Sequence, residues 1–186
     1  LRPLGDRLLL RGAKRWERYE ENLKTSGFAG TVRASRLTRE MVTPQLGARL
    51  ALGLGLTARG NWSRSERAPD FLELFGNQGA VQGNPALLPE RVTTRDAGLA
   101  WLGRRGRARF EIEGWNFSNE ARDLILLVRN SQSTLKATNV ARMETRGREL
   151  SARVTLPGGV SIGGAGTWQE ARDRGTVSAW RGRKVP

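Results

Sequence analysis

Hydrophobic and polar residues alternate along most of this chain with a period of two, which is the pattern of β-strands that have one apolar and one polar face. In Glu149–Leu156, for example, Leu, Ala, Val and Leu alternate with Glu, Ser, Arg and Thr. The alternation predicts an all-β protein of about seven strands. We place them near residues 7–16, 45–52, 56–63, 96–101, 107–117, 149–156 and 160–169.

The alternation changes phase once, near Gly114. Ala108, Phe110 and Ile112 share one parity, whereas Trp115 and Phe117 fall on the other. Glycine inside a strand often marks an extra, unpaired residue that shifts the phase. The sequence therefore predicts a β-bulge at Gly114.

The connections between the predicted strands differ in length at the two ends. Short Gly- or Pro-rich turns are predicted at Gly53–Gly55, Gly103–Gly106 and Pro157–Gly159, and long loops at Glu17–Thr43, Ser65–Arg91 and Asn119–Ala137. This asymmetry is typical of bacterial outer-membrane barrels, in which the short turns face the periplasm. A soluble β-sandwich also has period-two strands, but it has less reason to sort its loops by length.

Composition excludes several classes of site. The 186 residues include neither Cys nor His, which rules out disulfides, Cys/His zinc sites and His-based catalytic triads. Hydrophobic residues make up 38% of the chain, below the ~45–50% of globular domains. The longest apolar run, Leu124–Val128, is far shorter than the ~20 residues of a membrane helix, so any membrane crossing is predicted to use strands.

The net charge of +14 comes from 32 Lys and Arg residues, only four of them Lys, against 18 Asp and Glu residues. Such an excess suggests nucleic acid or anionic lipid as a partner. The arginines are scattered at alternating positions, without a basic helix or an aromatic-interleaved patch. We therefore expect arginines along strand faces and no nucleic-acid partner.

Several short motifs occur in a fixed order. They are Arg67-Ala68-Pro69, Glu73-Leu74-Phe75, Gly83-Asn84-Pro85 and Leu88-Pro89-Glu90, followed by Asp123-Leu124-Ile125, Asn139 and Gly147-x-Glu149. In this order and spacing they resemble the barrel domain of TonB-dependent outer-membrane receptors. The resemblance covers essentially the whole chain and is most specific from Pro44 to Val154.

The resemblance implies an antiparallel, up-and-down transmembrane β-barrel in the lipid of the bacterial outer membrane. Residues 1–186 would be a middle part of that barrel, with the plug domain and the C-terminal strands absent. It also implies that the receptor binds and imports a scarce small-molecule nutrient, such as an iron–siderophore complex or cobalamin, energised through TonB. The alternative is a soluble, basic β-sandwich that binds anions or nucleic acid.

Two sets of residues are candidates for the site. The first lies in the long loop after the third strand, where aromatic and amide side chains suit ligand contact: Arg67, Phe71, Phe75, Asn77 and Gln78. The second is the polar parity of the strands, which the resemblance places on the barrel lumen: Arg59, Asn61, Arg107, Arg109, Glu111, Glu113, Glu149 and Arg153.

No catalytic, cofactor or metal site is predicted. Glu111 and Glu113 lie about 6.6 Å apart along one strand, a spacing found between glycosidase carboxyl groups. Arginines on the same strand would keep both ionised rather than poised as acid and base. Without His or Cys, a metal would need carboxylates, and these show no EF-hand-like spacing.

Overall fold

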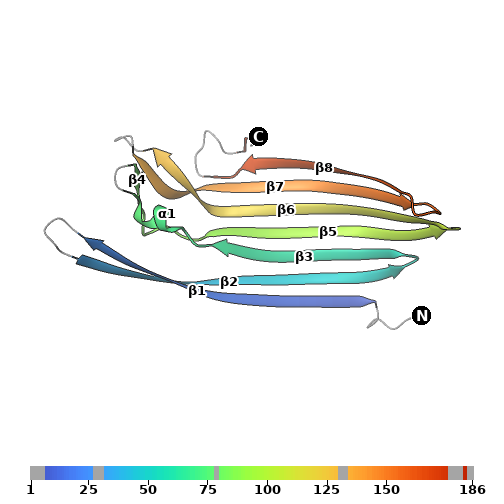
Figure 1. Cartoon of the computed structure of the whole chain (residues 1–186), viewed down its shortest axis with the longest axis horizontal. Coiled ribbons are helices and arrows are strands. Elements are labelled where there is room, and N and C mark those ends of the chain that lie inside the picture. The colour runs from blue at the N-terminus through green and yellow to red at the C-terminus, as the bar shows by residue number, and fades with distance from the viewer. Residues whose placement is uncertain (1–6, 27–31, 78–79, 130–133, 176–181, 184–186) are drawn as a thin grey trace.

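The computed structural model describes residues 7–26, 32–77, 80–129, 134–175 and 182–183, and most of them lie in one sheet (Figure 1). The elements are, in chain order, β1 (Leu8–Ser26), β2 (Val32–Gly53), β3 (Leu56–Arg67), α1 (Phe71–Phe75), β4 (Val81–Gln82), β5 (Glu90–Arg105), β6 (Ala108–Arg129), β7 (Leu135–Thr155) and β8 (Ser161–Asp173). No helix among the described residues is long and apolar enough to cross a membrane.

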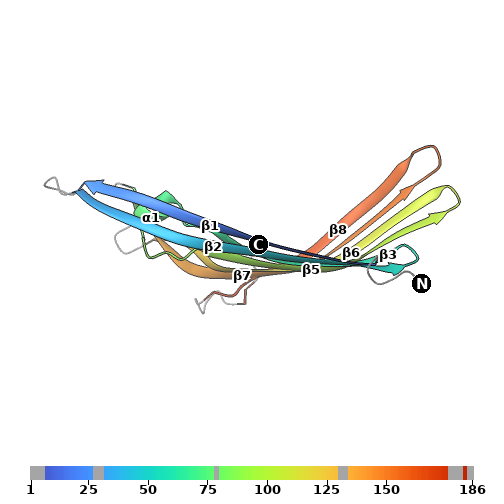
Figure 2. The same ribbon diagram turned by 90° about the horizontal axis from the view of Figure 1, so that it is seen from below.

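The long strands pair with their neighbours in chain order, β1-β2-β3-β5-β6-β7-β8, and every one of these pairings is antiparallel. The two-residue strand β4 adds a parallel pairing to the start of β7. Seen from below, the strands form a single bent and twisted layer (Figure 2). The predicted up-and-down, all-β architecture of about seven strands is confirmed, and a two-layer sandwich is not favoured.

Two of the three predicted long loops are wrong, because their residues continue the strands. In place of a loop over Glu17–Thr43, β1 and β2 stay paired from Leu8↔Leu50 to Ser26↔Val32. In place of a loop over Asn119–Ala137, β6 extends to Arg129 and β7 begins at Leu135. In these halves the two faces of a strand are alike, since residues 17–26 are mostly polar on both faces and residues 124–128 are apolar on both faces. Backbone pairing thus continues where the hydrophobic alternation has ended.

The third prediction, a long loop over Ser65–Arg91, is confirmed in position: β3 ends at Arg67 and β5 begins at Glu90. The three short turns are also confirmed, and they lie together at the opposite end of the sheet, on the right in Figure 1. Positive φ angles at Gly53, Gly106 and Gly158 explain why glycine occupies these turns.

The predicted bulge at Gly114 is wrong, because Gly114 pairs in unbroken register with Leu99 and Leu150. The phase changes because two aromatic residues stand on the polar face. A Cβ on Gly98 would lie 2.5 Å from the Trp115 ring, and one on Gly147 would lie 2.3 Å from the Phe117 ring. Each ring thus covers a glycine of the neighbouring strand. The register of β6 shifts later, between Ala121 and Ile125.

A single sheet has no interior, and the small buried core lies beneath the long loop instead. It contains Leu74 of α1, Leu87 of the loop and Ala137 of β7, and Phe75 and Ile125 pack against it. The loop is therefore a folded part of the molecule rather than a loose connection.

Candidate functional site

The segment between β3 and β5, residues 68–89, is hereafter the docked loop. Asp70 is the N-cap of its helix, α1. Asp70 Oδ1 accepts a hydrogen bond from Glu73 N at 2.8 Å, and Glu73 Oε2 accepts one from Asp70 N at 2.7 Å. This reciprocal capping box satisfies two amides that one turn of helix leaves without intrahelical partners. The local sequence Asp-Phe-Leu-Glu thus explains why a helix forms here.

Ion pairs join the two ends of the docked loop. Arg67, the last residue of β3, donates from Nε to Glu90 Oε2 at 2.6 Å and from Nη2 to Glu73 Oε1 at 3.1 Å. Glu90, the first residue of β5, also accepts a hydrogen bond from Ile125 N at 2.8 Å. The hydrogen bond from Arg67 is the main reason that the pKa of Glu90 lies below its usual value. Arg67 therefore holds helix α1 and strand β5 together.

Two asparagines fasten the docked loop to β7. Asn139 accepts from Leu88 N at 2.8 Å and donates to two carbonyl oxygens, Leu88 O at 3.0 Å and Asp123 O at 2.6 Å. Asn84 donates from Nδ2 to Ala137 O at 3.0 Å. The sequence analysis named Asn84, Glu90 and Asn139 only as members of the motifs, and it did not predict that they attach the loop. Their place in the fixed order of motifs was the signal that pointed to them.

The residues predicted to contact a ligand have different surroundings in the docked loop. Phe71 is 58% exposed, and its ring centroid lies 5.0 Å from that of Phe75, which packs against the small core. Asn77 Oδ1 accepts hydrogen bonds from Ala80 N and Val81 N and so closes a turn. Arg67 is held in the ion pairs above, and Gln78 lies outside the described residues. Among the predicted side chains that are described, Phe71 is thus an exposed aromatic ring, whereas Phe75 packs against the core.

The register brings most of the predicted polar residues to one face of the sheet, hereafter the polar face. They are Arg59, Asn61, Arg109, Glu111, Glu113, Glu149 and Arg153. Asn61 donates to Asp96 Oδ1 at 2.6 Å across β3 and β5. Arg107 is not on a strand, since it lies in the turn between β5 and β6.

The opposite face carries large exposed hydrophobic residues, and we call it the apolar face. On β5 to β8 they are Leu99, Trp101, Ile112, Leu150, Ile162 and Trp168. The two tryptophans Trp101 and Trp168 both lie on this face. An apolar face this exposed needs a non-aqueous partner.

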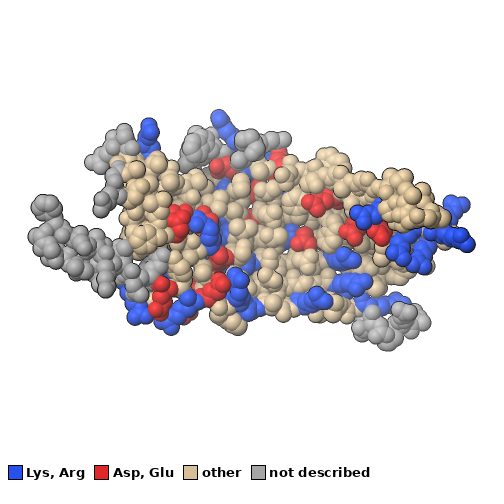
Figure 3. All heavy atoms as spheres, in the orientation of Figure 1, with Lys and Arg blue, Asp and Glu red and all other residues tan. Residues whose placement is uncertain are grey.

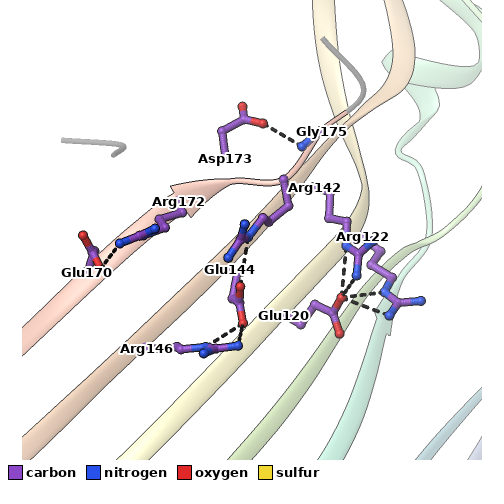
Figure 4. A network of polar contacts seen from close by, with 10 residues as sticks. Glu120, Arg122, Arg142, Glu144, Arg146, Glu170, Arg172, Asp173 and Gly175 are labelled. Carbon is purple, nitrogen blue, oxygen red and sulfur yellow. Dashed lines mark hydrogen bonds and ion pairs between the residues drawn. The ribbon is translucent and has the colours of Figure 1, made fainter. Parts of the chain in front are cut away.

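Beyond the apolar residues, toward the docked loop, the same side of the strands is charged. Arginines surround each glutamate: Glu120 pairs with Arg122 and Arg142, and Glu144 with Arg146 and Arg174 (Figure 4). Because Glu120 and Glu144 lie directly opposite each other on β6 and β7, these arginines offset a repulsion between like charges. We call this group the arginine–glutamate belt.

Comparisons with known proteins agree on one family. The family described as "TonB dependent receptor-like, beta-barrel" matches residues 2–184. No match was found among curated protein sequences. The solved structures that the chain resembles include a copper transporter, OprC, with 19% identity and a TM-score of 0.72, where the match covers 98% of this chain and 28% of OprC.

Two further structures have the same fold. The iron transporter FrpB from Neisseria meningitidis is 17% identical with a TM-score of 0.66, and the match covers 94% of this chain and 25% of FrpB. The alcaligin outer-membrane receptor FauA from Bordetella pertussis is 18% identical with a TM-score of 0.61, with 99% and 30% covered. At these identities the likeness concerns the fold, and the chain spans about a quarter to a third of each structure.

Proposed function

This chain belongs to the family of TonB-dependent receptor β-barrels, and we propose that it forms a middle part of a receptor that imports a scarce nutrient with energy supplied through TonB. Barrels of this family lie in the bacterial outer membrane and transport rather than catalyse. The nutrient we propose is an iron–siderophore complex or another metal-bearing compound such as cobalamin.

The observation that carries this proposal is the two-faced single sheet. An exposed apolar face suits lipid, and a polar face on the same strands suits a hydrated lumen. Seven long strands supply about a third of a 22-stranded barrel, which agrees with the share of the similar structures that the chain spans. The predicted lumen-facing role of the polar residues fits this arrangement.

The ligand class rests on the similar structures and on the docked loop. The similar structures are described as copper, iron and alcaligin receptors, and one is a hemophore receptor in complex with its hemophore and heme. The docked loop lies at the end opposite the short turns, which in these barrels is the extracellular end. We propose that Phe71 contacts the ligand, while Arg67, Phe75 and Asn77 hold the loop in place.

Uptake by cells that carry the whole receptor tests this function. We expect accumulation of a radiolabelled iron–siderophore or of cobalamin to require both the receptor and TonB, and to stop when either is deleted. Uptake that persists without TonB would contradict the proposal.

A loop variant tests the ligand contact. Phe71→Ala should raise the Kd of the imported ligand about tenfold, since a ring contact contributes about 1–1.5 kcal/mol. Leu72→Ala, one residue further along the same helix and also exposed, is the matched control. Equal affinities for both variants and the unaltered receptor would remove Phe71 from the ligand site.

A further inference from the structure

Four arginines gather at the end of the β5–β6 hairpin: Arg104, Arg105, Arg107 and Arg109, hereafter the arginine tip. All four are exposed. Arg104 and Arg109 are directly opposite each other in the register. Like charges in that position destabilise a strand pair. Both of these arginines lie on the polar face, which the proposed function assigns to the lumen, whereas Arg105 lies on the apolar face and Arg107 lies in the turn. Figure 3 shows Lys and Arg side chains gathered at this right-hand end of the sheet.

Among the described residues, no carboxylate neutralises the arginine tip. No ion pair between described side chains involves any of the four, and those that form lie toward the docked loop. The sequence around the short turns also lacks carboxylates, since residues 41–65, 97–110 and 150–169 contain neither Asp nor Glu. The nearest carboxylate along the hairpin is Glu111, which the register places opposite Leu102 and Arg153.

The surroundings of the arginine tip are apolar. In the β2–β3 turn Leu54 is 99% exposed, and after the turn that follows β7, Val160 is 57% exposed. The first of these turns is held against β5, because Trp101 Nε1 donates to Leu54 O at 3.1 Å and Leu102 N donates to Gly55 O at 3.0 Å. Exposed apolar residues and arginines therefore lie at the same end of the sheet.

Arg105 continues the apolar face beyond its last aromatic residue. Trp101, Gly103 and Arg105 share one side of β5, and the Trp101 ring covers Gly103, where a Cβ would lie 2.3 Å from the ring. Tryptophan at this position is typical of the boundary between hydrocarbon and headgroups. Arg105 lies about 14 Å further along the strand, at the depth of the headgroups, and its long side chain can reach back to them.

We propose that Arg105 and Arg107 of the arginine tip bind the phosphate groups of anionic phospholipids in the periplasm-facing leaflet of the outer membrane. Basic residues beside exposed apolar ones are what an anionic membrane surface binds, whereas an acidic protein partner would leave Leu54 and Val160 in water. The inference requires the family's place in the membrane, not the identity of the nutrient.

The test uses the whole receptor in nanodiscs of phosphatidylcholine and phosphatidylglycerol, with a trace of photoactivatable lipid of either headgroup. Crosslinks to residues 104–109 are mapped by mass spectrometry, and the yield with phosphatidylglycerol is divided by the yield with phosphatidylcholine. Arg105→Gln/Arg107→Gln should lower this ratio about 25-fold, because each arginine near such a surface contributes about fivefold. High salt should lower the ratio as well.

The matched control is Arg122→Gln/Arg142→Gln, which removes the same charge from the arginine–glutamate belt and should leave the ratio unchanged. Three results would overturn the proposal. They are equal crosslinking of both lipids to the unaltered tip, an equal loss in the control, and crosslinking of the tip to an acidic protein in intact cells. Nutrient uptake by the tip variant separates this result from the proposed function, because a tip that binds only lipid leaves uptake intact.

Discussion

Asn139 makes two of the side-chain hydrogen bonds that attach the docked loop to β7, so we choose Asn139→Ala as the perturbation of this end of the molecule. The change removes three hydrogen bonds, two to the backbone of Leu88 and one to the carbonyl of Asp123. A neutral hydrogen bond contributes about 1 kcal/mol net, and Asn139 is half-buried. Only the two bonds to Leu88 join the loop, so we expect the free energy of loop docking to fall by about 2 kcal/mol.

Hydrogen exchange of the whole receptor in detergent measures this loss at the Leu88 amide. If exchange requires the loop to open locally, a loss of about 2 kcal/mol raises the exchange rate about 30-fold. Thr138→Ala, on the same strand and likewise half-buried, is the control and should leave the rate unchanged. A change below threefold in Asn139→Ala, or an equal change in the control, would refute the idea that Asn139 fastens the loop.

Three other predictions concern single residues. The pKa of Glu90 is lower in the folded state, so the contribution of Glu90 to loop docking should be full above about pH 4.3 and be lost as the pH falls further. Hydrogen exchange of the Leu88 amide, corrected for the pH dependence of its intrinsic rate, should show this loss. Glu90→Gln should abolish the pH dependence. Asp123 has a φ of 57°, so Asp123→Val should lower the unfolding temperature of the receptor, whereas Asp123→Gly should not. Gly147→Ala should destabilise the receptor by about 1–3 kcal/mol by thermal unfolding, because its Cβ meets the Phe117 ring, while Gly164→Ala, with open space, should be neutral.

The strands could be predicted where they have one apolar and one polar face. They were missed where the two faces are alike, polar in residues 17–26 and apolar in residues 124–128. Alternation reports burial on one side, not hydrogen bonding along the backbone. The pairing of Glu17 with Met41 or of Asn119 with Thr145 leaves no such trace in the sequence. The predicted loops therefore began where the apolar face ends rather than where the strands end.

The candidate site was predicted unevenly for a related reason. The motif around Arg67 and Glu90 located the loop, but its partners on β7 lie about fifty residues further along the chain. Only the three-dimensional register shows that Asn139 meets Leu88. The aromatic residues of β6 were misread in a similar way, since Trp115 and Phe117 cover glycines of neighbouring strands and need no bulge at Gly114.

The distribution of charge along this chain is not explained by its arginine-rich composition alone. An arginine-rich composition adds positive charge everywhere, but it does not remove carboxylates from one end of every hairpin. Here the glutamates of the arginine–glutamate belt stand near the docked loop, where each is paired, whereas residues 41–65, 97–110 and 150–169 around the short turns have none. A carboxylate at that rim would be repelled by anionic headgroups, and the absence of Asp and Glu from the stretches around the three short turns is what a negatively charged membrane surface on that side would favour.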